Sequence, residues 1–407
     1  MKPILKQILK QTVSILVCIL CFSGMVYAKE TPDKRFKAIA KTINARDSIL
    51  IADEYGKIVF SKYADNRLAP ASTFKLLTSL AAIHYLGINY RFRTEFYIDE
   101  HLNLKIKGYG DPLLVSEMLP GICKAIRQRL GEHIHLNNLI LDDSYFAPFT
   151  VPGVSDSLKP YDAANGALSV NFNTLCFKET PTGYEGAEPQ TPLIQFAIDK
   201  IRTITHPLKK KRINLTNGET TLYAGHLFRY FLEKEGISFS GNMMTGNVEK
   251  TDMLLMPHIS EFSLEDAIEK LLLSSNNFIA NQIFVTIGAS VYGQPGTLEK
   301  GVSAVSEYAR TVLKTENIQV AEGSGIAREN QICAKDMLKI LEKFKPYRYL
   351  MRHEDRVIYK TGTLSDVSTR AGYIEDSGGK KYSFVIFCNT PGKPAHKILA
   401  KLLKVLK

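Results

Sequence analysis

The sequence predicts an α+β fold in which a five-stranded antiparallel sheet lies between helices and inserted β-rich sequence divides this domain in two. Three observations predict it. Two strand patterns stand close to the N-terminus and three more close to the C-terminus. A buried helix follows the first pair of strands directly. Short strands and turns fill most of the 203 residues from Ser72 to Ser275, which is enough chain for a domain or two.

The five sheet strands are expected at hairpins. Glu54-Tyr55-Gly56 joins the first pair and the glycine-containing run Asp376–Lys381 joins the last two strands, as short polar turns do in antiparallel sheets. The expected strands are Ser48–Asp53, Lys57–Ser61, Arg356–Thr363, Arg370–Glu375 and Tyr382–Cys388. Within the insertion we expect short strands at Phe92–Ile98, Leu104–Lys107, Leu139–Asp142 and Thr220–Tyr223.

The helix expected after the first hairpin carries a Ser-x-x-Lys pair near its start. Pro70 favours initiation and Gly87 ends the apolar pattern. Ser72, in the first turn, would have its hydroxyl near the positive end of the helix dipole and its own N–H unpaired. Lys75 follows one turn later on the same face. To act as a base it needs a pKa roughly 3 units below about 10.4, through burial or a second cation, for which Lys360 is the candidate.

A second polar cluster, Ser274–Asn277, precedes another apolar helix. It fits a Ser-x-Asn pattern in two registers, Ser275 with Asn277 or Ser274 with Asn276. The plain structural interpretation is that these serines and asparagines cap the helix that follows.

A third polar group, Lys360-Thr361-Gly362, stands at the end of the expected strand Arg356–Thr363. We expect Gly362 to let the backbone approach a ligand closely, because glycine has no side chain to hold the ligand away.

Ser-x-x-Lys, Ser-x-Asn and Lys-Thr-Gly, in this order, resemble the signature of penicillin-binding proteins and serine β-lactamases. One such motif alone occurs by chance in most chains, so the order and the structural context carry the argument. The chain most resembles the class C low-molecular-mass D-alanyl-D-alanine carboxypeptidases and endopeptidases, in which an insertion follows the Ser-x-x-Lys helix. Family-like stretches stand at Gly108–Pro112, Ala167–Asn171, Asn277–Asn281 and Gly323–Asn330. The third of them favours the register Ser275 with Asn277. Glu322 departs from the usual aspartate and Ala327 from the usual serine.

The resemblance implies a transpeptidase-like domain and a role for each motif. Ser72 would attack the carbonyl of the penultimate D-Ala, Lys75 would take its proton, and Ser275 would pass a proton to the leaving group. The backbone N–H groups of Ser72 and Thr363 would form the oxyanion hole. Asn277 would hold the substrate amide. The terminal carboxylate would be bound by Lys360, Thr361, Gly362 and Thr363.

The resemblance also implies a role for Asp142, which follows an expected strand of the insertion. An aspartate at this position would meet the amino group of diaminopimelate in the stem peptide. The alternative is a strand-ending aspartate that forms an Asx turn.

The implied function is that of a serine D-alanyl-D-alanine carboxypeptidase, a DD-endopeptidase or both. Its partners would be peptidoglycan stem peptides as substrates and β-lactams as covalent inhibitors. We expect no cofactor, no metal ion and no nucleic-acid partner. A β-lactamase is one alternative, but Glu299, Glu307 and Glu316 lack the Glu-x-x-Leu-Asn context of class A enzymes and Ser-Asn-Asn replaces the Tyr-x-Asn of class C enzymes. A catalytically idle wall-binding protein is another, against which the intact motif residues argue.

Residues 1–28 are expected to form a signal peptide. Three lysines precede the apolar run Val13–Phe22, and Val26-Tyr27-Ala28 fits a cleavage site. Cleavage would lower the formal charge from +11 to +8 and place the protein in the periplasm or another extracytoplasmic space, near an anionic wall polymer or membrane surface. The expected domain bounds are 29–90 and 255–407 for the transpeptidase-like domain and 91–254 for the insertion.

The C-terminal segment 395–407 is a basic amphipathic helix. Such a helix packs its apolar face on the domain's own sheet or lies on a membrane surface. Four cysteines remain after residue 28, Cys123, Cys176, Cys333 and Cys388, and their wide spacing favours no disulfide framework.

Overall fold

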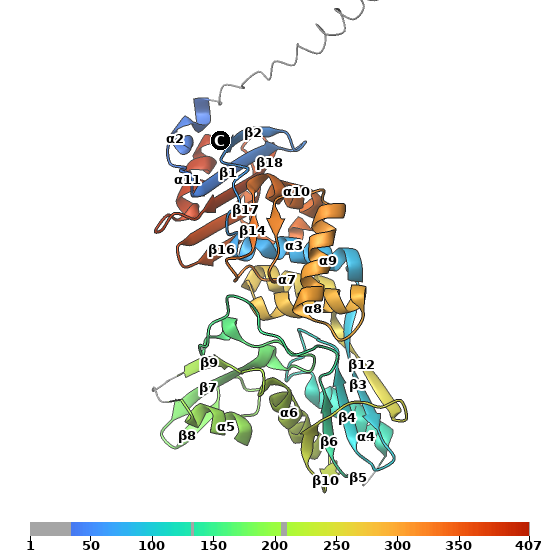
Figure 1. Cartoon of the computed structure of the whole chain (residues 1–407). Helices are drawn as coiled ribbons and strands as arrows, with labels where there is room; N and C mark the ends of the chain where they lie inside the picture. The colour runs from blue at the N-terminus through green and yellow to red at the C-terminus, as the bar shows by residue number, and fades with distance from the viewer. Residues whose placement is uncertain (1–33, 132–133, 205–209, 407) are drawn as a thin grey trace, which may run out of the picture.

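A six-stranded antiparallel sheet forms the centre of the domain at the top of Figure 1. The computed structural model describes residues 34–131, 134–204 and 210–406, so the predicted signal peptide lies outside the described residues. In spatial order the strands are β15 (Arg352–Glu354), β16 (Val357–Leu364), β17 (Val367–Glu375), β18 (Lys381–Cys388), β1 (Asp47–Asp53) and β2 (Ile58–Lys62). All five predicted strands are present, and the short β15 adds a sixth beside β16.

Helices cover both faces of this sheet. One face packs on α2 (Lys37–Ala40) and α11 (Ala395–Val405), whose Ile398 and Leu402 are buried in a shared core. The apolar side of the C-terminal helix therefore packs on the protein's own sheet, which was the first of its two expected placements. Among the described residues no helix has the length and apolar character needed to cross a membrane, and all four described cysteines are free.

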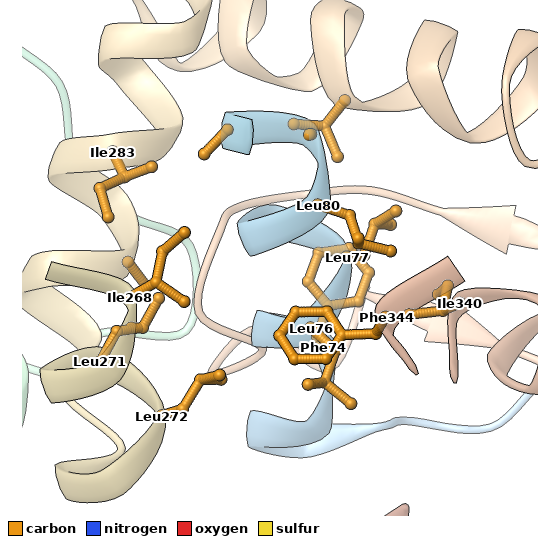
Figure 2. Close-up of a cluster of buried hydrophobic side chains, with 14 of the residues drawn as sticks. Phe74, Leu76, Leu77, Leu80, Ile268, Leu271, Leu272, Ile283, Ile340 and Phe344 are labelled. Atoms are coloured by element: carbon orange, nitrogen blue, oxygen red, sulfur yellow. The ribbon is translucent and has the colours of Figure 1, made fainter. Parts of the chain in front are cut away.

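The opposite face of the sheet packs on a layer of helices centred on α3 (Lys75–Leu86). A 3-10 turn, η2 (Ala71–Phe74), leads into α3, and every residue from Lys75 to Ala82 is buried. The surrounding helices are α7 (Leu264–Ser274), α8 (Asn277–Tyr292), α9 (Leu298–Thr311) and α10 (Ala334–Phe344). Figure 2 shows the core between them, with Phe74, Leu76, Leu77, Leu80, Ile268, Leu271, Leu272, Ile283, Ile340 and Phe344 labelled. The α3 helix therefore starts with a lysine inside an apolar core.

The insertion leaves this domain and returns to it through two neighbouring strands. β3 (Arg91–Ile98) follows α3, β12 (Met253–Ser263) precedes α7, and the two pair antiparallel with Arg91 opposite Ser263. The predicted boundary after residue 254 thus falls at the start of β12. The insertion's main sheet contains, in spatial order, β11 (Met243–Thr245), β6 (Leu139–Asp142), β4 (Leu104–Gly108), β3 and β12.

Helices pack on this second sheet around a core of their own. These are α4 (Leu119–Leu130) and α6 (Thr220–Lys234). The predicted strand Thr220–Tyr223 is wrong, because it is the first turn of α6. Its β-branched threonines suggested a strand. The chain instead continues as a helix, and Leu227 and Phe228 lie on the side of that helix that is buried. The remaining described elements of the insertion are β5 (His135–Leu136), η3 (Pro160–Asp162), η4 (Asn171–Asn173), β7 (Thr174–Thr180), β8 (Gly183–Gly186), α5 (Gln195–Arg202), β9 (Lys210–Asn214) and β10 (Ser238–Phe239).

Truncating Phe344 should destabilise the helical layer strongly. The Phe344 ring is fully buried between α10 and the η2–α3 segment, so Phe344→Ala should lower the free energy of unfolding by about 3 to 5 kcal/mol. Denaturant unfolding measures this change. Tyr55→Ala is the matched control, because Tyr55 is 86% exposed and its truncation should change stability by less than about 0.5 kcal/mol. Equal effects of the two variants would contradict the assignment of the core.

Candidate active site

The η2 turn holds Ser72 against the central sheet. The carbonyl of Pro70 accepts hydrogen bonds from Thr73 Oγ1 (2.7 Å) and from Thr369 Oγ1 of β17 (2.6 Å). Ser72 is the second residue of η2, so its N–H is one of those that lack an acceptor within the helix. The start of the helix is thus fixed to the sheet with the Ser72 N–H available.

Two glycines allow neighbouring backbone to reach η2. A Cβ on Gly362 of β16 would lie 2.8 Å from the Pro70 carbonyl oxygen and 2.2 Å from Thr369 Oγ1. Gly325 has φ +81°, and a Cβ there would lie 2.0 Å from the carbonyl oxygen of Ala71. The sequence assigned Gly362 to the approach of a ligand. In the structure, the space that a side chain of residue 362 would fill is occupied by the backbone just before Ser72.

The Nζ atom of Lys75 is the point where three separate segments meet. Lys75 is fully buried, and its Nζ lies 3.0 Å from Ser72 Oγ, 2.8 Å from Asn277 Oδ1 and 2.7 Å from the carbonyl oxygen of Ser324. The amide and carbonyl oxygens can only accept, so they take two Nζ hydrogens. In the neutral amine the remaining position is the lone pair, which then faces the Ser72 hydroxyl. This is the arrangement of a nucleophile and its general base.

Lys75 and a second buried lysine, Lys360, both have a lowered pKa. Burial lowers the pKa of Lys75 well below its ordinary value, the charge of Lys360 lowers it further, and the charge of Glu322 opposes them. Desolvation lowers the pKa of Lys360 to about 7, with a smaller contribution from Arg352. Both shifts have the direction that a catalytic lysine needs. The Lys360 Nζ donates to Ser275 Oγ (2.8 Å) and to the Thr361 carbonyl (2.9 Å).

The structure separates the two registers of the Ser-x-Asn pattern. Asn276 is the N-cap of α8, with its Oδ1 accepting from the N–H of Ile279 (3.0 Å). Ser274 is used locally as well, because its hydroxyl donates to the carbonyl of Lys270 one turn back. These two residues therefore follow the helix-capping interpretation.

Ser275 and Asn277 are the pair that the fold brings beside Ser72 and Lys75. Ser275 ends α7 with left-handed backbone (φ 57°), a conformation that is uncommon for serine and that directs its hydroxyl to Lys360. The Asn277 side chain accepts from Lys75 through Oδ1 and donates through Nδ2 to the carbonyl of Tyr161 (3.3 Å). Tyr161 belongs to the insertion, so the insertion helps to orient a site residue.

Sequence reasoning noted Glu322 only as a departure from the family's usual aspartate and missed its role, which is to shape the segment beside Lys75. Glu322 is fully buried in the turn between β13 (Ile318–Gln319) and β14 (Gln331–Ile332). Its carboxylate accepts from the N–H groups of Ser324 (2.6 Å), Gly325 (2.6 Å) and Ala327 (3.3 Å) and from the side-chain amides of Asn281 (3.1 Å) and Asn330 (2.6 Å). These bonds hold the Ser324 carbonyl in place for Lys75. The available signal was a lone acid beside two glycines and an asparagine, which alone does not indicate burial.

Thr361 and Thr363 lie where the outer edge of β16 is open. β15 pairs only with Val357–Tyr359, so within the described chain no strand pairs with the edge from Lys360 to Leu364. Thr363 is exposed there, and Thr361 is half-buried. Unpaired backbone groups on a strand edge can bind an extended peptide as an added strand.

The structure does not bring Asp142 together with these residues. Asp142 ends β6 in the insertion and is fully buried. Its Oδ1 accepts from the N–H (2.9 Å) and hydroxyl (2.6 Å) of Ser144, and its Oδ2 accepts from Lys107 Nζ (3.0 Å) and the N–H of Val248 (2.7 Å). Burial is the largest single influence and acts to raise the pKa of this carboxyl, but the hydrogen bonds together lower it below its ordinary value. Both oxygens are occupied, which favours the Asx-turn alternative over a substrate contact.

A half-buried serine beside a buried lysine at the start of the central helix, next to a Lys-Thr-Gly strand, defines an active-site-serine enzyme of the penicillin-recognising class. The chain belongs to the D-Ala-D-Ala carboxypeptidase 3 (S13) family, whose model matches residues 44–353.

Named relatives agree with this family. The chain is 23% identical to D-alanyl-D-alanine carboxypeptidase DacB of Haemophilus influenzae, over 86% of this chain and 84% of that protein. It is 24% identical to a D-alanyl-D-alanine carboxypeptidase of Actinomadura sp., over 85% of this chain and 78% of that one. The crystal structure of penicillin binding protein 4 (dacB) from H. influenzae has a TM-score of 0.72 with it at 20% identity, covering 90% of this chain and 97% of that chain.

Neutralising Glu322 should destabilise the protein and its loop. An amide cannot accept from all five donors, so Glu322→Gln should leave buried N–H groups unpaired and cost about 3 kcal/mol. Denaturant unfolding measures this loss. Glu329→Gln is the control, because Glu329 is exposed in the same turn and should change stability by less than about 0.5 kcal/mol. An unchanged free energy of unfolding in the Glu322→Gln variant would mean that the carboxylate does not hold this turn.

Proposed function

We propose that the protein is a secreted serine DD-peptidase that cleaves the D-Ala-D-Ala end of peptidoglycan stem peptides, or the cross-links made from it, through an acyl-enzyme on Ser72. The observation that carries this proposal is the position of Lys75 Nζ, which lies 3.0 Å from Ser72 Oγ. Its two other contacts, Asn277 Oδ1 and the Ser324 carbonyl oxygen, can only accept hydrogen bonds. Family membership supports the substrate class.

Acylation begins with proton transfer from Ser72 to Lys75. The freed Oγ adds to the carbonyl carbon of the penultimate D-Ala, and the resulting oxyanion is bound by the N–H groups of Ser72 and Thr363. Ser275 receives a hydrogen bond from Lys360, which leaves its own O–H to face the leaving nitrogen. The proton held by Lys75 is relayed through Ser275 to the leaving nitrogen, so the C–N bond breaks, D-Ala or the cross-linking amine departs, and Lys75 is neutral again for deacylation.

The open edge of β16 provides the substrate cradle. An extended peptide bound from Lys360 to Thr363 lies beside η2, because Gly362 lets β16 touch that turn. The substrate carboxylate then meets the Lys360 charge and the hydroxyls of Thr361 and Thr363, and Asn277 holds the acyl-side amide. Water adds next to the acyl carbon and returns a proton to Ser72 through Lys75.

β-Lactams fit the same site as covalent inhibitors. The strained amide places its carbonyl on Ser72, and the opened ring stays attached, so the leaving group does not diffuse away. A structure of the H. influenzae protein complexed with a β-lactam has a TM-score of 0.67 with this chain at 21% identity, covering 88% of this chain and 94% of that one.

Benzylpenicillin should add one penicilloyl group to the secreted protein, and Ser72→Ala should abolish the adduct because it removes the attacking oxygen. Intact-protein mass spectrometry reads this out. Ser274→Ala is the control, since that hydroxyl is tied to the Lys270 carbonyl and should leave labelling unchanged. An adduct on the Ser72→Ala variant would place the nucleophile elsewhere. Fast turnover of the drug without an adduct would indicate a β-lactamase.

Removing the charge of Lys360 should move the acidic limb of the pH–rate profile of acylation to higher pH. Lys360 lowers the pKa of Lys75, so in Lys360→Gln the base stays protonated to a higher pH. The shift should be partial, because burial of Lys75 is the larger cause and is retained. Rates of benzylpenicillin acylation between about pH 5 and 9 measure it. Lys343→Gln, at an exposed lysine of α10, is the control. An unchanged acidic limb of the pH–rate profile would show that the charge of Lys360 does not affect the pKa of Lys75.

A further inference from the structure

A basic face covers the side of the central sheet that points away from the helical layer. It is formed by η1 (Lys34–Phe36), α2 and α11, which lie side by side (Figure 1). Their apolar residues are buried against the sheet, and five lysines are exposed: Lys37, Lys41, Lys397, Lys401 and Lys404. In α11 the three lysines follow each other at intervals of four and three residues, so they share one side of the helix.

The net positive charge of the protein is concentrated in the two segments that build this face. Residues 34–46 contain five Lys and Arg and residues 389–407 contain five Lys, and neither segment contains an Asp or Glu. The rest of the sequence after residue 28 has a formal charge of −2. A solvated surface that served only solubility would mix both signs.

The side chains of these five exposed lysines are unpaired among the described residues. None of them forms an ion pair or a side-chain hydrogen bond within the part of the chain that the structure describes. Lys393, by contrast, pairs with the buried Asp47 and is therefore structural. Since the apolar side of α11 is already covered, the free side offers charge alone, and its partner must be anionic.

We propose that this basic face docks the protein peripherally on an anionic lipid membrane. The first described residue, Lys34, belongs to this face, so the sequence before it, with its apolar run Val13–Phe22, joins the protein here. During export, before cleavage after Ala28, this face would thus be the part of the protein nearest the bilayer. In Figure 1 the insertion extends from the opposite end of the molecule, so a docked protein would project it away from the lipid.

Vesicle sedimentation of the secreted protein, without its signal peptide, tests the proposal. We expect binding to vesicles of phosphatidylcholine with about one-third phosphatidylglycerol, no binding to phosphatidylcholine alone, and release at about 0.5 M NaCl, where the Debye length is about 4 Å. The triple variant Lys397→Gln/Lys401→Gln/Lys404→Gln should lower binding at least tenfold, since each lysine near an anionic surface contributes about one factor of five.

A charge-matched variant separates the face from net charge. Lys124→Gln/Lys250→Gln/Lys343→Gln removes three exposed lysines outside the face and should leave vesicle binding unchanged. Both triple variants should still be labelled by benzylpenicillin, which reports folding. Equal loss in both variants, or no binding to anionic vesicles, would overturn the proposal. Binding to soluble poly(glycerol phosphate) but not to vesicles would overturn it in favour of an anionic wall polymer.

Discussion

The burial of one amine, Lys75 Nζ, is the constraint on which the site depends. Lys75 and the next two turns of its helix are buried, so the amine depends on acceptors that the protein supplies. Asn277 and Ser324 supply two of them, from segments about 200 and 250 residues further along the chain. The third contact is the nucleophile. Burial therefore favours the neutral lysine and orients its lone pair, so the desolvation that costs stability also prepares the base.

The surrounding structure keeps those acceptors in position. Glu322 is a buried charge, and its cost is offset by five hydrogen bonds that turn the chain so that the Ser324 carbonyl faces Lys75. On the other side, Asn277 is held by the carbonyl of Tyr161 from the insertion. A further tie from the insertion joins Asn165 to Gln282 and the Phe278 carbonyl on α8. The insertion is thus coupled to the catalytic helices at the site as well as through its paired strands.

Much of this architecture was predictable because its signals are local. Hairpin turns and apolar runs revealed the five main strands, and Pro70 with Gly87 bounded the central helix. Other features depended on how the chain folds. Thr220 suggested a strand, whereas its segment forms a helix that packs on a sheet, and the bonds from Asn281 to Glu322 and from Lys107 to Asp142 join residues distant in sequence. The choice between the two Ser-x-Asn registers came from family resemblance, because the pattern of apolar residues in the following helix does not distinguish Asn276 from Asn277.

The short length of β15 has a consequence for the behaviour of the protein at high concentration. Unpaired strand edges invite pairing with any extended chain, which is why most proteins cover them. Here β15 stops after three residues and leaves the neighbouring edge, from Lys360 to Leu364, without a partner strand among the described residues. At about 3.3 Å per residue this opening is about 17 Å long, which is the length of one short strand and enough for an extended peptide. The length of one minor strand thus sets how much of the edge is open to substrate and, at high protein concentration, to another chain.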